Sequence, residues 1–147
     1  MSVGDRHRAV VLRLATFDAQ FRVHNCFLQT QQPIVLPPDN EPEPDASIIR
    51  GPLEASTTKP RAAEVMCVIE VADSSLRRDL GPKLRAYAAA TIPQYIVVDL
   101  QHDVVLVHTV PTGLRYGNVV ELRRGEHVAL SANGGAAVTV PVDVLLP

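Results

Sequence analysis

Cysteine is scarce in this 147-residue chain, and its two copies are not arranged as metal ligands. Cys26 and Cys67 show no CxxC spacing and have no histidine cluster beside them. Both fall in apolar, strand-like stretches, where a free thiol behaves as a small hydrophobic group. We therefore expect two buried structural thiols.

Long apolar runs are also missing. No stretch approaches the roughly 20 apolar residues that a membrane-spanning helix needs. Residues 1–8 are polar and charged, without the apolar core of a signal peptide. We expect a soluble, cytoplasmic protein with no membrane partner. With no internal repeat, no low-complexity tail and 46% hydrophobic residues, the chain suits one compact domain over residues 1–147.

The chain lacks the excess of positive charge that is typical of nucleic-acid-binding domains. Fourteen basic residues oppose 16 acidic ones, for a formal net charge of −2. Attraction to DNA must therefore be local. Each clustered basic residue also fits an ordinary solvated face. The clusters are Arg77, Arg78, Lys83 and Arg85, and then Arg123 and Arg124.

The first half of the chain mixes helical and strand-like patterns. Apolar residues at helical spacing predict a helix over Val3–Ala19, and alternation predicts a strand over Phe21–Phe27. Pro33–Leu36 indicates a short second strand before a proline-rich loop, and Asp45–Ile49 a third strand. Gly51–Arg61 is rich in turn residues and is expected to be a loop.

The second half begins with the most apolar stretch, Val65–Ala72, which indicates a central strand covered on both faces. Asp79 is expected to cap a helix that runs to about Ala90, and Gln94–Leu100 indicates a second buried strand. These segments predict a strand, helix, strand unit with a right-handed crossover. The remaining strands are expected to form antiparallel hairpins: Val104–Val107, Val119–Leu122, His127–Leu130 and Ala137–Val140.

Two carboxylates stand at positions suited to a metal. Asp45 follows an acidic, proline-rich loop, and Glu70 lies inside the apolar Val65–Ala72 stretch, where a carboxylate is costly without a cationic partner. Mg²⁺ held by two carboxylates neutralises a phosphodiester and activates water. Asp45, Glu70 and the backbone carbonyl of Val71 are therefore candidate Mg²⁺ ligands.

The helix after Glu70 supplies the candidate cation. Lys83 is expected to orient the attacking water and to stabilise developing charge. Asp79, one turn earlier, either caps the helix or pairs with Lys83 to support it. Tyr87 lies on the same face and is expected to contribute packing.

Together, these residues resemble the Uma2 family of the restriction-endonuclease-like PD-(D/E)xK superfamily. The resemblance covers Arg6 to about Val107 and includes an early histidine, His7. Its motifs are Pro44-Asp45, Ile69-Glu70-Val71, Asp73-Ser74-Ser75, Arg78-Asp79, Lys83, Tyr87, Ile92-Pro93-Gln94-Tyr95 and Val97-Val98-Asp99.

The resemblance implies an α/β fold: a mixed β-sheet with a restriction-endonuclease-like core, flanking helices and C-terminal β-hairpins. It assigns Asp45 to the PD motif, Glu70 to the second acidic position and Lys83 to a lysine displaced onto the helix. The usual lysine position, two residues after Glu70, is occupied by Ala72. Family members usually carry more sequence before the early histidine, so the chain is expected to be shortened there.

Three functions fit this pattern. The first is a Mg²⁺-dependent endonuclease acting on DNA, with Mn²⁺ as a second possible metal and catalytic residues Asp45, Glu70, Lys83 and Asp79. The second is a catalytically degenerate module for binding or assembly that forms a homodimer through its hairpin edges. The third is a hydrolase of a smaller phosphate ester, which a closed pocket would favour over an open groove.

Overall fold

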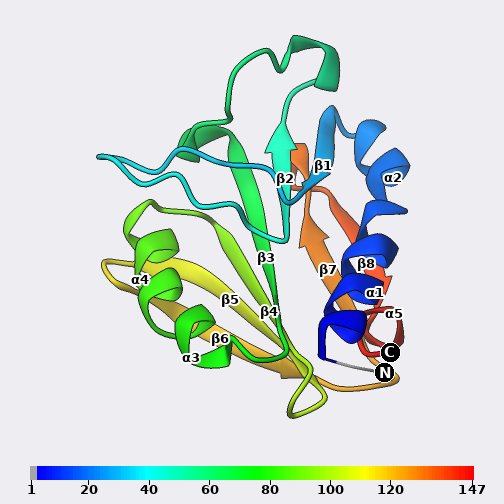
Figure 1. Ribbon diagram of the computed structural model, residues 1–147. Helices are drawn as coiled ribbons and strands as arrows, with labels where there is room; N and C mark the ends of the chain where they lie inside the picture. Colours follow the sequence, from blue (N-terminus) through cyan, green and yellow to red (C-terminus); the bar gives the residue numbers. More distant parts are fainter. Residues whose placement is uncertain (1–2) are drawn as a thin grey trace.

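The computed structural model describes residues 3–147 and contains one large sheet, a smaller sheet and short helices around them (Figure 1). The helices are α1 (Val3–Ala15), α2 (Asp18–Arg22), α3 (Leu76–Asp79), α4 (Pro82–Ala89) and α5 (Val142–Leu145). The strands are β1 (Cys26–Thr30), β2 (Ala46–Arg50), β3 (Val65–Ala72), β4 (Gln94–Asp99), β5 (Val104–Thr112), β6 (Arg115–Leu122), β7 (His127–Ser131) and β8 (Ala137–Pro141).

The large sheet is mixed, as expected for the predicted α/β fold. Its six strands lie in the order β1-β2-β3-β4-β5-β6. Only β3 and β4 are parallel, and the other neighbours are antiparallel. Every residue of β3 and β4 is buried, which confirms both as central strands. Joining two parallel neighbours requires a crossover, and here α3 and α4 provide it.

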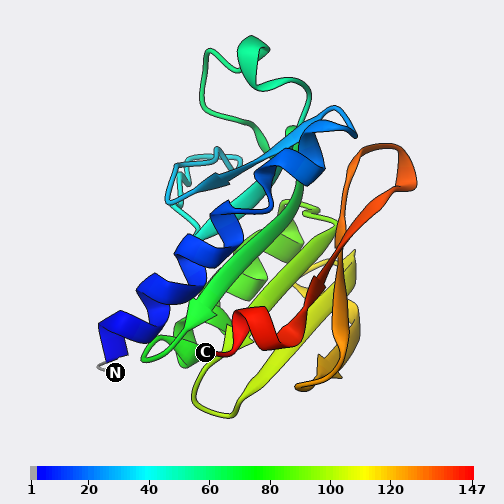
Figure 2. The ribbon, with the colours of Figure 1, turned by 90° about the vertical axis from the view of Figure 1, so that its right-hand side faces the viewer.

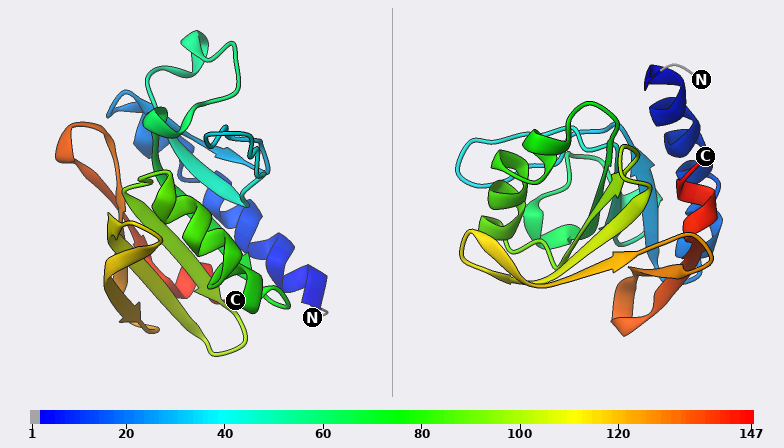
Figure 3. Two further views of the ribbon diagram at one scale, coloured as in Figure 1. Left: turned by 90° about the vertical axis from the view of Figure 1, so that its left-hand side faces the viewer. Right: turned by 90° about the horizontal axis from the view of Figure 1, so that it is seen from below.

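Different elements cover the two faces of the sheet (Figures 2 and 3). On one face, Val10 of α1 and Val128 of β7 share a hydrophobic cluster with Ile69 of β3. On the other face, Tyr87 of α4 packs in a second cluster with Val68. Since Val68 and Ile69 are neighbours on one strand, their side chains point to opposite faces of the sheet. β3 therefore contributes to both clusters.

The beginning of the chain differs from its prediction. The helix expected over Val3–Ala19 ends at Ala15, where the Thr16 hydroxyl donates to the Arg13 carbonyl at 2.6 Å. A second helix, α2, then includes Phe21, so the start of the strand predicted over Phe21–Phe27 was wrong: the strand begins at Cys26 and runs to Thr30. The side chain of Phe21 is fully buried where α2 packs on the core. Phe21 also fits the alternating apolar pattern of a strand, which explains why the sequence predicted one here.

In the part of the chain that the structure describes, Pro33–Leu36 does not form the regular strand that was predicted. Val35 and Leu36 form only isolated bridges, to Arg61 and Asn40. Pro33 has no N–H to donate to a ladder, and the Ile34 N–H bonds instead to the Pro42 carbonyl at 3.0 Å. This segment therefore folds back on itself.

The predicted C-terminal hairpins are confirmed, but their roles differ. β5 and β6 pair with each other and extend the large sheet through β4, whereas β7 and β8 form a separate two-stranded sheet. The first hairpin turns at Gly113, whose φ of +66° is easily adopted by glycine. Both strands extend up to this turn, so they are longer than predicted.

Both cysteines are free and buried, as the sequence indicated. Burial raises the pKa of each thiol, which keeps them protonated and unreactive. Over residues 3–147, no helix has the length and apolar character needed to span a membrane.

Candidate active site

Asp45 and Glu70 meet at the point where β2 begins. Ala46 of β2 pairs with Ile69 of β3, so the preceding Asp45 comes to lie beside Glu70. The Asp45 backbone N–H donates to Glu70 Oε1 at 3.3 Å, and Asp45 Oδ2 accepts the Val71 N–H at 2.8 Å. Strand pairing thus brings together two carboxylates that are 25 residues apart in sequence.

Glu70 is the buried member of this pair, with only 2% of its surface exposed. Its Oε2 accepts a hydrogen bond from the Tyr87 hydroxyl at 2.9 Å and lies 3.1 Å from Lys83 Nζ. Burial raises the pKa of Glu70 to about 7; Lys83 opposes this rise, and Asp45 adds to it. Tyr87, expected only to pack, is therefore also a polar partner of the site.

Lys83 connects Glu70 to a third carboxylate. Its Nζ lies 3.2 Å from Asp79 Oδ1, one helical turn before it in sequence, and the lysine side chain is 37% exposed. Burial lowers the pKa of Lys83, but the carboxylates of Glu70 and Asp79 outweigh this effect and raise it overall. Lys83 therefore stays positively charged while still reaching solvent.

Asp79 does not cap the helix that carries Lys83, so that part of the prediction was wrong. It is the last residue of α3 and is 1% exposed. Its Oδ2 accepts the Ser75 hydroxyl at 2.6 Å, and its carbonyl accepts the Tyr95 hydroxyl at 2.8 Å. The alternative prediction, a pair between Asp79 and Lys83, matches the observed contact.

α1 approaches the carboxylates from the other side. His7 Nε2 lies 2.9 Å from Asp45 Oδ1, and Asp45 keeps 16% of its side chain exposed. Arg6 donates to the Leu100 carbonyl at 2.8 Å and lies 3.9 Å from Asp73, fixing α1 against the ends of β3 and β4. No spacing in the sequence identified Arg6, because its partners lie far along the chain.

The family model for Uma2, described as "Putative restriction endonuclease", matches residues 1–141. The chain belongs to the Uma2 family. This assignment supports a nuclease-like function. No curated protein matches the sequence.

One solved structure has a similar fold. It is the crystal structure of "a putative nuclease belonging to DUF820" from Anabaena variabilis, with 10% sequence identity and a TM-score of 0.65. The match covers 95% of this chain and 79% of that one. At this identity, the likeness establishes the nuclease-like fold of the Uma2 chain and nothing finer.

The site of this Uma2 protein has a donor set that fits Mg²⁺. Within residues 3–147, no group of three or more His, Cys, Asp or Glu side chains has the arrangement of a metal site. Mg²⁺ requires less, because it keeps several waters and commonly takes one or two carboxylates. The Val71 N–H points toward Asp45, and in a strand the carbonyl of the same residue faces the same edge.

The charges of the site also fit a cation. Three carboxylates share two basic partners: Lys83 contacts Glu70 and Asp79, and the His7 imidazole contacts Asp45. The pKa of Glu70 is raised because these partners do not fully offset the cost of burying its charged carboxylate. A divalent cation would supply the missing positive charge.

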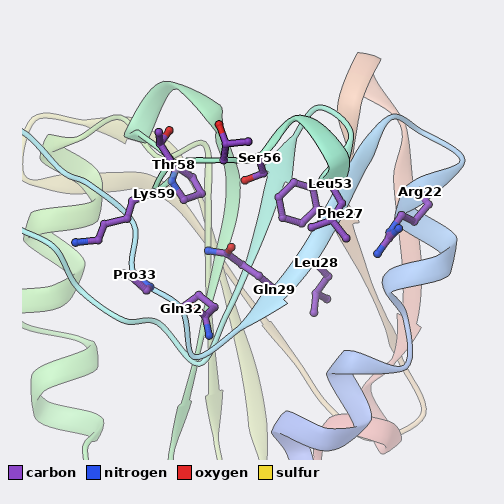
Figure 4. Close-up of a pocket in the computed structure, with 12 residues that line it drawn as sticks. Arg22, Phe27, Leu28, Gln29, Gln32, Pro33, Leu53, Ser56, Thr58 and Lys59 are labelled. Atoms are coloured by element: carbon purple, nitrogen blue, oxygen red, sulfur yellow. The ribbon is translucent and has the colours of Figure 1, made fainter.

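A separate cavity of about 440 Å³ lies between β1 and the loop that follows β2 (Figure 4). Gln29 and Gln32 line it from the β1 side, and Ser56 and Lys59 from the loop. None of Asp45, Glu70 and Lys83 lines this cavity. The carboxylates instead reach solvent through the partly exposed Asp45 and Lys83.

Proposed function

We propose that this Uma2 protein is a Mg²⁺-dependent endonuclease that hydrolyses phosphodiester bonds of DNA, with Mn²⁺ as an alternative metal. The observation that carries the proposal is the contact of Asp45 and Glu70 across two strands, with Lys83 placed on Glu70. Family membership supports the same class of function.

Asp45, Glu70 and the Val71 carbonyl would hold the metal. When bound, Mg²⁺ supplies positive charge for the phosphoryl oxygens and lowers the pKa of a bound water. Lys83, which stays protonated, donates a hydrogen bond that orients the attacking water. The water oxygen would bond to phosphorus as a P–O ester bond breaks, with loss of a water proton to solvent and uptake of a proton from solvent by the leaving oxygen, which leaves a phosphate end and a hydroxyl end.

The remaining residues position these groups. Tyr87 holds Glu70 Oε2, and Asp79 holds the Lys83 ammonium toward Glu70. His7 holds Asp45 Oδ1 from α1. Lys83 takes the role of the superfamily lysine because Ala72 has only a methyl group at the usual position, whereas α4 brings an ammonium to within 3.1 Å of Glu70.

The test is cleavage of supercoiled plasmid and single-stranded DNA with Mg²⁺ or Mn²⁺. Asp45→Asn and Glu70→Gln keep the side-chain shapes and should abolish metal-dependent cutting. Glu54→Gln is the matched control, since the Glu54 side chain is 78% exposed and lies 3.9 Å from Arg22.

Two outcomes would contradict the proposal. If the Asp45 and Glu70 variants cut as well as the wild type, the nuclease site lies elsewhere or the activity is a contaminant. If the wild type cuts no DNA with either metal, the degenerate binding or assembly module becomes the better explanation. The homodimer expected from the sequence stays a prediction, and sedimentation of the wild type tests it.

A further inference from the structure

The chain contains the tripeptide Leu-Arg-Arg twice, which gives it two pairs of adjacent arginines. One copy, Leu76–Arg78, lies in α3, and the other, Leu122–Arg124, lies at the end of β6. All four arginines are exposed. The two pairs are chemically identical, so any difference in their role must come from their surroundings.

The pair after β6 is already neutralised by its neighbours. Arg123 Nη2 lies 3.0 Å from Glu121. Arg124 donates two hydrogen bonds of 2.6 Å to the carboxylate of Asp103 and a third of 2.7 Å to the Leu146 carbonyl. These guanidinium groups are committed to contacts within the protein.

The pair in α3 has no such partners. Within residues 3–147, neither the Arg77 nor the Arg78 side chain forms an ion pair or hydrogen bond. The adjacent carboxylate, Asp79, is buried and turned inward to Ser75 and Lys83. Both guanidinium groups therefore face solvent with their full charge.

Local structure explains this orientation. Leu76 and Asp79 are three residues apart, so they share one face of α3, and that face packs against the protein. Arg77 and Arg78 lie between them and must point away. The Tyr95 hydroxyl holds the end of α3 through the Asp79 carbonyl at 2.8 Å, so the outward face has a fixed position.

That position is next to the proposed catalytic site. Arg78 is bonded in sequence to Asp79, which contacts Lys83 at 3.2 Å, and Lys83 contacts Glu70 at 3.1 Å. A strand whose scissile phosphate lies at the carboxylates would therefore pass α3. Arginine forks match phosphate oxygens in a bidentate geometry.

We propose that Arg77 and Arg78 bind backbone phosphates of DNA beside the scissile phosphate, as the local cationic surface of a protein whose total charge is −2. This inference rests on the proposed nuclease function. It makes α3 the element that binds DNA. The chemically identical pair, Arg123 and Arg124, takes no part in this binding.

The test compares two double variants with the same charge change, R77A/R78A and R123A/R124A. Binding of a short labelled duplex and of the matching single strand is measured by fluorescence anisotropy in EDTA, over a series of KCl concentrations. Two lost phosphate contacts should reduce the slope of log K against log salt by about 1.8 for the duplex and about 1.4 for the single strand. R123A/R124A should keep the wild-type slope, and R77K/R78K, which keeps both charges, should largely restore it.

Equal slope losses in both double variants would mean that only total charge matters, and an unchanged slope in R77A/R78A would mean that α3 binds no phosphate. Either result overturns the inference. Thermal unfolding of each variant checks that the fold is intact. Wild-type cleavage with Mg²⁺ separates the two proposals, because cutting with an unchanged R77A/R78A slope refutes only the arginine assignment. Binding that depends on Arg77 and Arg78, without cutting, refutes only hydrolysis.

Discussion

Glu70 is a buried carboxyl group, and folding therefore changes its pKa. This change links the stability of the protein to pH. Its pKa in the native state is about 7, against an ordinary value of 4.5, chiefly because it is buried. Between these values, the native protein holds a proton that the unfolded chain has released. The free energy of unfolding should therefore fall as pH rises from about 4.5 through 7.

We predict that Glu70→Gln removes this dependence. Between pH 5 and pH 8, the wild type should lose about 2.5 kcal/mol of stability relative to the variant, because one pKa unit corresponds to about 1.4 kcal/mol. Urea unfolding at several pH values measures the difference, and titrating groups that do not interact with Glu70 cancel in the comparison. Parallel curves for the two proteins would show that Glu70 titrates normally.

Lys83 is one of two lysines in the chain, and the other provides its control. Lys83→Met leaves the buried carboxylates of Glu70 and Asp79 without their shared cation and should destabilise the protein by about 1–3 kcal/mol. Lys59 pairs with the exposed Glu41 at 2.8 Å, so Lys59→Met should cost less than about 1 kcal/mol. Equal losses in urea unfolding would contradict the role given to Lys83.

At the scale of elements, the buried centre was predictable and the polar connections were not. Val65–Ala72 and Gln94–Asp99 are strands almost as expected, because long apolar β-branched runs leave few alternatives. The prediction failed at Phe21, whose side chain fits either a helix or a strand pattern, and at Asp79, whose burial depends on Ser75, Lys83 and Tyr95. Tertiary contacts decided both positions.

The break between α3 and α4 depends on Gly81. A Cβ there would lie 2.6 Å from the Arg77 carbonyl oxygen, which is backbone and cannot move aside cheaply. Gly81→Ala should therefore destabilise the protein by roughly 1–3 kcal/mol and displace Lys83 from Glu70. The control is Gly4→Ala in α1, where no atom lies within 4 Å, and it should be neutral or slightly stabilising. A lower melting temperature for Gly4→Ala than for Gly81→Ala would refute this account.

On the scale of the whole molecule, the site joins segments that are far apart in the sequence, and their contacts depend on the fold. Asp45, Glu70 and Lys83 could be selected from their local patterns, but their contacts depend on the pairing of β2 with β3 and on the crossover through α4. His7 and Arg6 come from α1, which packs on the opposite face of the sheet from α4. Their contacts with Asp45 and Asp73 could not be derived from spacing.

A metal bound by Asp45 and Glu70 would tie these segments together, so it should stabilise the entire fold. Binding to the native state alone raises the free energy of unfolding by about 2.7 kcal/mol at a metal concentration 100 times Kd. Urea unfolding with and without Mg²⁺ should show this increase for the wild type and for Glu54→Gln, and little or none for Asp45→Asn or Glu70→Gln.

The increase should also depend on pH, because Mg²⁺ requires the ionised carboxylate while Glu70 has a pKa of about 7. At a fixed Mg²⁺ concentration, stabilisation should be larger at pH 8 than at pH 6, where protons compete for Glu70 and weaken binding by about tenfold relative to pH 8. Calorimetry in buffers of different ionisation enthalpy should detect release of a proton near pH 6. Equal stabilisation at both pH values, or in all four proteins, would place the bound metal away from Glu70.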